Sequence, residues 1–139
     1  MNITMRKKAR ENLFKLIFEL IFSNFQPNSK SFSLLCSSDF PNEDIEYIKE
    51  VYYGVIDKNK ELSLIIEKHA QGFNLDRIYK TDLAALLLST YEIMFLKDIP
   101  INVSIAEAIN LVKIYSTEKS SAYVNGILSS INKELTNKS

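Results

Sequence analysis

The sequence predicts an all-α fold, a single-domain bundle of six or seven helices over residues 1–139. Only three glycines and three prolines occur among the 139 residues, too few turn-forming residues for a many-stranded sandwich or a glycine-rich nucleotide loop. Apolar residues recur at helical spacing, and no segment shows the alternation of a half-buried strand. With 46% hydrophobic and 24% charged residues, the chain has the composition of a globular domain rather than a disordered one.

The first expected helix joins a basic start to an apolar run over residues 13–22. Most of its circumference is apolar: one stripe follows a spacing of three to four residues, and aromatic rings recur at every fourth residue. The positions are Leu13, Leu16, Ile17, Leu20 and Ile21, with Phe14, Phe18 and Phe22. We expect neighbours to surround this helix, with its polar first two turns projecting beyond them. A secretory signal is not expected, because Lys15 and Glu19 interrupt the apolar run and no small-residue cleavage site follows.

The later elements are bounded by proline, glycine, serine and threonine signals. They are a loop over 25–41 with one turn near 32–36, a helix from Pro41 to about Gly72 with a bend near 57–60, a helix over 80–97, a helix to about Tyr115, and a last helix from after Thr117 to about Leu135 with a frayed tail over 136–139. Ser104-Ile105-Ala106-Glu107 has the pattern of a capping box, which predicts a helix start at Ser104.

Few residues in the chain are of the types that form disulfides, bind metals or catalyse reactions. One cysteine, Cys36, and one histidine, His69, cannot form an internal disulfide or a four-ligand zinc site, and no metal or cofactor is expected. No catalytic motif occurs. His69 is expected to be an exposed helix-end residue, and Glu92 is a lone carboxylate among apolar neighbours. The sequence therefore indicates a binding protein, not an enzyme, and the lack of disulfides fits the reducing cytoplasm.

The charges are balanced in number but not in position. Seventeen basic and seventeen acidic side chains cancel, yet residues 1–20 hold five basic and two acidic side chains, whereas residues 39–57 hold six acidic ones and one lysine. We expect an electrically asymmetric molecule whose acidic part repels polyanions. Cations at the start of a helix also oppose its dipole, so another reason for them is needed.

Several ordered elements together resemble the NusB family of transcription antitermination factors over nearly the whole chain. They are Arg6-Lys7-Lys8-Ala9-Arg10-Glu11, Tyr91-Glu92, Asp98-Ile99-Pro100, Ile105-Ala106-Glu107-Ala108, Leu111-Val112-Lys113, and Ser120 to Leu128 with Tyr123-Val124-Asn125-Gly126. The resemblance implies an all-helical protein that binds the single-stranded boxA element of ribosomal RNA operon transcripts. It also implies a NusE-type small-subunit ribosomal protein as partner, other Nus factors and RNA polymerase as further partners, and no membrane.

The resemblance also implies which residues bind. The RNA-binding candidates are Arg6, Lys7, Lys8, Arg10, Phe18, Lys119, Tyr123 and Asn125, and the partner-binding candidates are Tyr91 and Glu92. Cations supply phosphate contacts and aromatic rings supply stacking platforms for splayed bases. If all four cations of the first two turns meet phosphates, affinity falls about fifty-fold between 50 and 200 mM salt.

Several of these positions have a second interpretation. Phe18 and Tyr123 are either stacking platforms or core residues, and Lys119 is either a phosphate contact or an exposed lysine. Asn125 either contacts RNA or caps a neighbouring helix. Gly126 is expected where another helix approaches closely, because a glycine inside a helix costs about 1 kcal/mol.

Three residues depart from the family pattern. Leu87 stands where members often carry arginine, Ala106 where they carry asparagine, and Lys119 where they often carry an acid. The first two changes place partner docking in doubt. The alternative function is a stand-alone protein-interaction module, including a homodimer, related to the N-terminal domain of ribosomal RNA cytosine methyltransferases.

Overall fold

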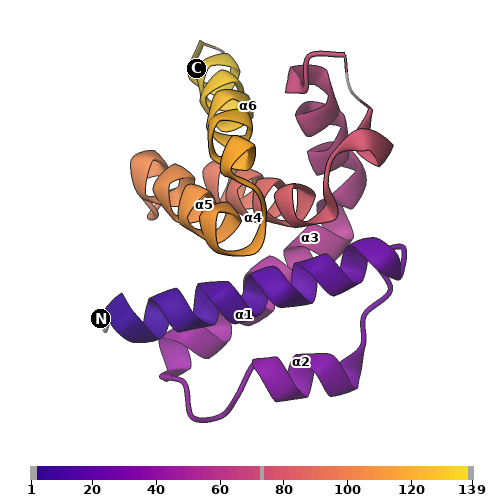
Figure 1. Ribbon diagram of the computed structural model, residues 1–139. Coiled ribbons are helices and arrows are strands. Elements are labelled where there is room, and N and C mark those ends of the chain that lie inside the picture. The colour runs from indigo at the N-terminus through magenta and orange to yellow at the C-terminus, as the bar shows by residue number, and fades with distance from the viewer. Residues whose placement is uncertain (1–2, 73, 138–139) are drawn as a thin grey trace.

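The computed structural model describes residues 3–72 and 74–137, and none of these lies in a strand. Within these residues, six α-helices and one 3₁₀ turn follow one another (Figure 1). They are α1 (Ile3–Phe22), α2 (Ser29–Leu35), α3 (Asn42–His69), η1 (Leu75–Arg77), α4 (Lys80–Phe95), α5 (Ile101–Tyr115) and α6 (Glu118–Asn137). The prediction of an all-α bundle is confirmed.

Helix α4 forms the centre of the bundle, in contact with α1, α3, α5 and α6. Every residue from Asp82 to Ile93 is buried, as expected of a helix that is apolar on more than one face. Helix α1 crosses α3 on one side of α4, and α2 packs along α1 on the side away from α5 and α6 (Figure 1). The core therefore runs continuously from α1 through α4 to α6.

The first two turns of α1 do not project as expected. Ala9 and Arg10 are buried, with exposures of 0% and 5%, because α1 lies across both α3 and α4 from its start. The expectation failed because the acid that pairs with Arg10 is Glu92, 82 residues away along the chain.

The capping-box prediction is wrong. Helix α5 begins at Ile101, directly after Pro100, and Ser104 lies inside it. The Ser104 hydroxyl donates instead to Glu92 Oε1 at 2.7 Å, and Glu107 pairs with Lys7. Proline at a helix start already has the required φ, so both side chains remain free for tertiary contacts.

The other boundaries lie within a few residues of their predicted positions. Helix α2 starts earlier than the expected turn because Asn28 caps it, accepting from the backbone N–H of Lys30 and Ser31 at 3.0 Å each. Helix α3 is uninterrupted over 57–60 and ends before Gln71 and Gly72, whose φ values of 52° and 89° turn the chain. Helix α6 extends to Asn137, so of the predicted frayed tail only 138–139 lie outside the described residues.

None of the described helices is long and apolar enough to span a membrane.

Candidate nucleic-acid interface

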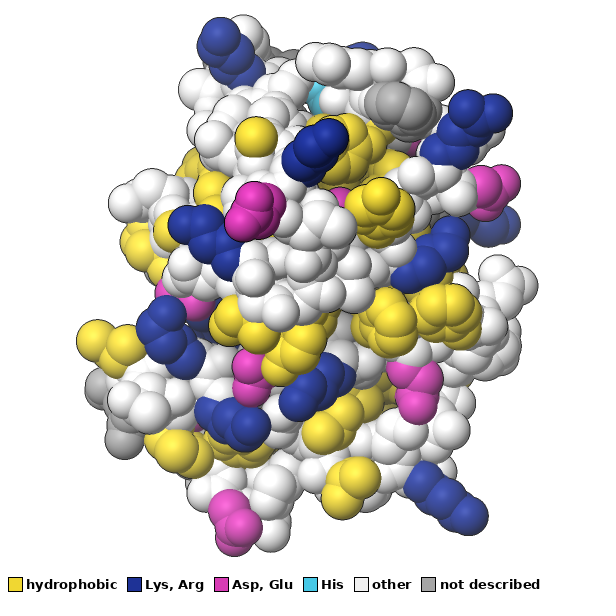
Figure 2. Space-filling view, in the orientation of Figure 1, with side chains coloured by type: hydrophobic (Ala, Val, Ile, Leu, Met, Phe, Trp, Pro, Cys, Tyr) yellow, Lys and Arg dark blue, Asp and Glu magenta, His cyan; other side chains and the backbone are white. Residues whose placement is uncertain are grey.

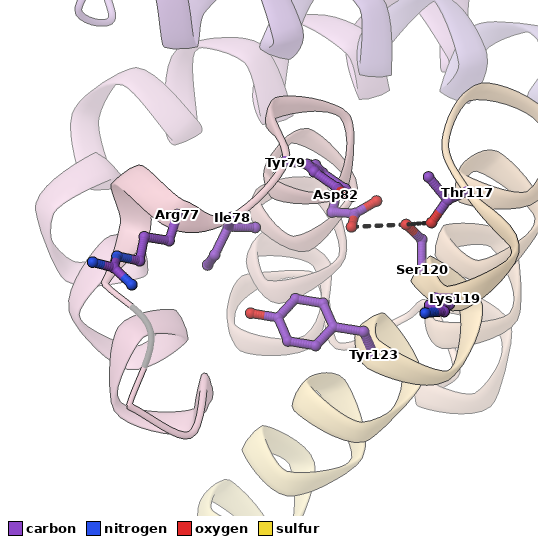
Figure 3. A pocket seen from close by; sticks show the side chains of 8 residues that line it. All are labelled: Arg77, Ile78, Tyr79, Asp82, Thr117, Lys119, Ser120 and Tyr123. Carbon is purple, nitrogen blue, oxygen red and sulfur yellow. Dashed lines mark hydrogen bonds between the residues drawn. The ribbon is translucent and has the colours of Figure 1, made fainter.

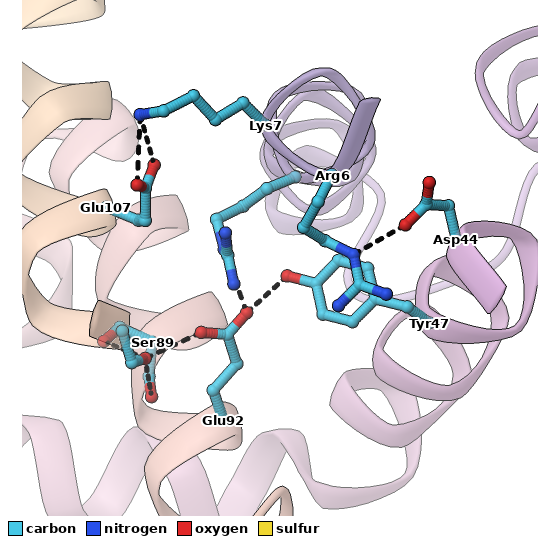
Figure 4. Close-up of polar contacts among 9 residues, drawn as sticks. Arg6, Lys7, Asp44, Tyr47, Ser89, Glu92 and Glu107 are labelled. Atoms are coloured by element: carbon cyan, nitrogen blue, oxygen red, sulfur yellow. Dashed lines mark hydrogen bonds and ion pairs between the residues drawn. The ribbon is translucent and has the colours of Figure 1, made fainter. Parts of the chain in front are cut away.

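The cations in the first turns of α1 are held by carboxylates of the same chain (Figure 4). The pairs are Arg6 Nε with Asp44 Oδ1 (2.7 Å), Lys7 Nζ with Glu107 Oε1 (3.1 Å), and Lys8 Nζ with Glu11 Oε1 (3.3 Å). The guanidinium of Arg6 also lies over the Tyr47 ring, 4.3 Å from its centroid. These internal acids supply a reason for cations at the positive end of a helix.

Arg10 is the most deeply placed of these cations. Its Nε donates to Glu92 Oε2 at 3.2 Å, and the hydroxyl of the buried Tyr47 donates to the same oxygen (Figure 4). Burial lowers the Arg10 pKa, but Tyr47 and Glu92 outweigh it, and the net pKa is raised. With Ser104 on the other carboxylate oxygen, Glu92 is fully satisfied inside the protein.

The pair predicted to bind a partner, Tyr91 and Glu92, lies largely inside the molecule, with exposures of 8% and 1%. The Tyr91 ring lies against Gly54 of α3, where any Cβ would overlap its hydroxyl end. Glycine is thus required at position 54 by the close approach of α3 and α4. Both side chains belong to the core, and their role in partner binding stays a prediction.

The basic first turns also adjoin the acidic segment. Arg6 bonds Asp44 at the start of α3 and shares a surface pocket with Glu43, Glu46 and Glu50. The expected separation of a basic part from an acidic part is therefore not what the structure shows here, because the crossing of α1 over α3 brings the two together.

A second region offers cations of a different kind. A pocket of about 340 Å³ lies between η1, the start of α4 and the start of α6 (Figure 3). Its lining residues are Arg77, Ile78, Tyr79, Asp82, Thr117, Lys119, Ser120 and Tyr123. It shares Tyr79 and Thr117 with a second pocket that also involves Phe18, Lys80 and Tyr115. It shares Tyr123 with a third beside Gly126. We call these three adjoining pockets the α4–α6 groove.

The cations of the α4–α6 groove are unpaired within the part of the chain that the structure describes. Arg77, Lys80 and Lys119 make no ion pair with any described carboxylate. On the face drawn in Figure 2, Lys and Arg side chains lie beside hydrophobic ones across the middle of the molecule. Cations beside apolar and aromatic groups are the combination that single-stranded nucleic acid requires.

Aromatic rings line the same groove. Tyr79 is 62% exposed, and Tyr123 and Phe18 are half-buried with part of each side chain packed on the core. The Phe18 ring also meets Phe22 edge-on, 5.0 Å between centroids. Burial and then the Asp82 charge raise the Tyr123 pKa. The core interpretation therefore holds in part for Phe18 and Tyr123, and stacking on bases stays a prediction.

The turn of α6 after Tyr123 is open. The expectation that a helix packs on Gly126 is wrong, because no atom of a neighbouring element among the described residues lies within 4 Å of where its Cβ would be. Asn125 is exposed and accepts from Ser129 Oγ at 3.3 Å within its own helix, and no hydrogen bond from it to a neighbouring helix end is seen among the described residues. Lys119 is exposed at the rim of the groove.

His69 is not the exposed residue that was expected. It is half-buried, with Nδ1 2.6 Å from Ser130 Oγ and Nε2 3.5 Å from Glu134 Oε1. The reason is that the last turn of α3 packs against α6. No group of three metal-ligating side chains is found in the described residues.

The departures Leu87 and Ala106 have different settings. Leu87 is fully buried in the core, so leucine there removes no surface contact. Ala106 is exposed on α5.

Sequence reasoning missed Arg77, Tyr79, Lys80 and Asp82. A signal was present, because cations and an aromatic residue are interleaved immediately before the most apolar helix. Their importance depends on α6 lying opposite them, which local pattern does not reveal.

Comparison with known proteins gives consistent matches. The model of the NusB family matches residues 7–133. The chain is 36% identical over 130 residues to the transcription antitermination protein NusB of Bacillus licheniformis, covering 94% of this chain and 98% of that protein. It is 38% identical over 128 residues to NusB of Ruminiclostridium cellulolyticum, covering 92% and 88%.

Solved structures share the fold. NusB of T. maritima has a TM-score of 0.86 at 32% identity, covering 93% of this chain and 91% of that chain. A chain in the crystal structure of antitermination factors NusB and NusE in complex with dsRNA has a TM-score of 0.82 at 28% identity, covering 96% and 99%. The similarity therefore extends over nearly the whole chain in sequence and in structure.

Proposed function

This chain belongs to the NusB family, and from that premise we propose that it is a transcription antitermination protein that binds RNA together with a NusE-type partner. One observation carries the RNA-binding part: the α4–α6 groove places Arg77, Lys80 and Lys119, which pair with no carboxylate of residues 3–72 and 74–137, beside exposed or half-exposed aromatic rings. A solved structure of similar fold contains NusB, NusE and dsRNA together, which supports a NusE-type protein and RNA as partners here.

The RNA we propose is the boxA element of ribosomal RNA operon transcripts. Lys119, Arg77 and Lys80 contact phosphates, while Phe18 and Tyr123 stack on bases. Asn125 and the open turn at Gly126 leave room for the RNA backbone to lie close to α6. This division follows from which side chains line the groove and which cations lack an internal acid.

The first turns of α1 have a smaller part in this proposal. The Lys7 and Lys8 side chains are 52% and 56% exposed, so they reach phosphates only by leaving their carboxylates. Arg6 and Arg10 mainly hold α1 against α3 and α4. The cytoplasmic location, the other Nus factors and RNA polymerase are part of the same proposal, as partners in an antitermination complex.

The test is fluorescence anisotropy with a short boxA RNA and a shuffled control, at two salt concentrations, with and without the NusE-type partner. We expect a preference for boxA that strengthens with the partner, and an affinity for both RNAs that falls in Lys80→Ala/Lys119→Ala because phosphate contacts are lost. The matched control is Lys30→Ala/Lys49→Ala, which removes two exposed lysines of α2 and α3 outside the groove. A duplex form of the same RNA distinguishes strand requirements.

Equal, weak binding to both RNAs, unchanged by partner or substitution, would overturn the proposal. Partner binding or homodimer formation without salt-sensitive RNA affinity would then favour the protein-interaction module.

A further inference from the structure

Lys15 is an exposed cation in the middle of α1. It makes no ion pair with any carboxylate of residues 3–72 and 74–137. Glu11 lies one turn earlier on the same helix, but both of its oxygens are engaged. Its Oε1 pairs with Lys8 Nζ at 3.3 Å, and its Oε2 accepts from the Tyr115 hydroxyl at 2.9 Å. The Lys15 charge is therefore available to an external anion.

Tyr115, the last residue of α5, presents an aromatic ring in a fixed orientation. The ring lies against that of the buried Phe14, 5.3 Å between centroids, and its hydroxyl is bonded to Glu11. Tyr115 is nevertheless 36% exposed, and it lines a pocket of about 390 Å³ that forms part of the α4–α6 groove. A ring that is fixed before binding loses little conformational freedom when a base stacks on it.

Lys15 and Tyr115 come together at one edge of the groove. The Lys15 Nζ atom lies over the Tyr115 ring, 5.9 Å from its centroid. This distance is close to the limit of about 6 Å for a cation–π interaction, so the ring holds the lysine only weakly. Phe18 follows Lys15 by three residues and so lies on the same side of α1, and it lines the same pocket as Tyr115. Lys15 therefore lies at the α1 edge of the α4–α6 groove.

Given the proposed RNA-binding function, on which this inference rests, we propose that Lys15 and Tyr115 form a further nucleotide subsite at the α1 edge of the groove. A base stacks on the Tyr115 ring, and the neighbouring phosphate binds the Lys15 ammonium group. Neither contact selects a particular base, because every base has an aromatic face and a phosphate carries no sequence information. The subsite lengthens the stretch of RNA that is bound and adds affinity without sequence preference.

A fluorescent reporter tests the stacking contact directly. The chain contains no tryptophan, so Tyr115→Trp introduces a single indole at the subsite. This variant is titrated with an oligouridine twelve-mer and with the boxA RNA. We expect the indole emission to be quenched over the concentration range in which anisotropy reports binding. The matched control is Tyr53→Trp, which places the indole at a 52% exposed tyrosine of α3 outside the three pockets of the groove. Its emission should stay unchanged.

Substitutions separate the phosphate contact from the stacking contact. Lys15→Ala should reduce the slope of log affinity against log salt by about 0.7, as one phosphate contact on a single strand does. Its control, Lys30→Ala, removes an exposed lysine of α2 outside the groove and should leave the slope unchanged. Tyr115→Ala should weaken binding about ten-fold without changing the slope. Tyr115→Phe keeps the ring and loses only the bond to Glu11, so it should restore binding to within about two-fold.

Three results would contradict this subsite. If boxA affinity depends on the lysines of the groove alone, and Tyr115→Trp is not quenched, the subsite is removed and the proposed function stands. Equal loss of affinity in Tyr115→Ala and Tyr115→Phe, again without quenching, means that the hydroxyl acts through Glu11 on the fold and not on a base. Absence of any RNA binding by the unchanged chain removes the proposed function and the subsite together. Where Tyr115→Ala fails to fold, the quenching and the Lys15→Ala slope still decide the question.

Discussion

The start of α1 and the α4–α6 groove both concentrate cations, but only the cations of the groove lack carboxylate partners among the described residues. At the start of α1, all four cations have carboxylate partners, and Arg10 is buried with its partner. In the groove, Arg77, Lys80 and Lys119 have no such partner among the described residues and stand beside aromatic rings. A run of basic residues therefore indicates a polyanion site only when the fold leaves it without internal acids.

The two regions also use glycine differently. Gly54 lies under the Tyr91 ring between α3 and α4, whereas Gly126 faces open space on α6. Packing requires glycine at position 54. Gly126 instead leaves room at the surface where we propose that RNA lies.

The largest effect is expected from removing the buried cation at the start of α1. We expect Arg10→Met to lower the free energy of unfolding by about 3–5 kcal/mol, because it leaves the Glu92 charge buried without its counter-ion. Urea denaturation measures this. The control is Lys8→Met, whose exposed pair with Glu11 is worth less than about 0.5 kcal/mol. Equal losses in the two variants would contradict a structural role for Arg10.

The second prediction concerns the salt dependence of RNA binding. We expect Arg77→Ala/Lys80→Ala/Lys119→Ala to reduce the slope of log affinity against log salt by about 2, because each phosphate contact on a single strand contributes about 0.7. Lys7→Ala/Lys8→Ala should reduce it by less than about 1, since these lysines exchange one anion for another. Anisotropy titrations at four salt concentrations give both slopes. A larger change in the α1 variant would reverse the roles assigned to the two regions.

The two glycines predict effects of opposite sign. Gly54→Ala should destabilise by about 1–3 kcal/mol, because the Tyr91 ring must move. Gly126→Ala should stabilise by about 0.5–1 kcal/mol, because alanine favours a helix and meets no neighbour. Thermal unfolding distinguishes them, and a destabilising Gly126→Ala would mean that this turn of α6 is not open.

The smallest expected effect tests the contact that joins the two regions. The Tyr115 hydroxyl donates to Glu11 Oε2 at 2.9 Å, and this bond, opposed by burial and aided by Lys8, lowers the Glu11 pKa. A carboxyl group with a lowered folded-state pKa contributes stability above its unfolded pKa and loses it as the pH falls through the folded value. Tyr115→Phe should therefore raise the Glu11 pKa toward its ordinary value, as measured by NMR titration. An unchanged titration would show that Lys8 and Lys15, not the Tyr115 hydroxyl, lower the Glu11 pKa.

Local pattern was enough for most of the helices. The spacing of apolar residues in α1, α3 and α4 and the Asp98-Ile99-Pro100 stop located these elements to within a few residues, because amphipathic periodicity and proline act within one or two turns. The capping box at Ser104 failed since the same side chains made better bonds to Glu92 and Lys7. A local motif predicts a cap only where no tertiary partner competes for it.

The site was harder to foresee than the fold. Phe18, Lys119, Tyr123 and Asn125 were identified through family resemblance, whereas Tyr79 and Asp82 emerged only when α4 and α6 were seen side by side. Their roles in binding remain predictions.

By itself the sequence determined the helical class, the order of the helices and the supply of cations and aromatic rings, since these follow from composition and short-range spacing. Only the tertiary structure decided which cations are neutralised and which glycine is enclosed. Those properties depend on pairs such as Arg10 with Glu92 and Arg6 with Asp44, separated by 82 and 38 residues along the chain. Packing brings such pairs together across helices, and no local pattern records it.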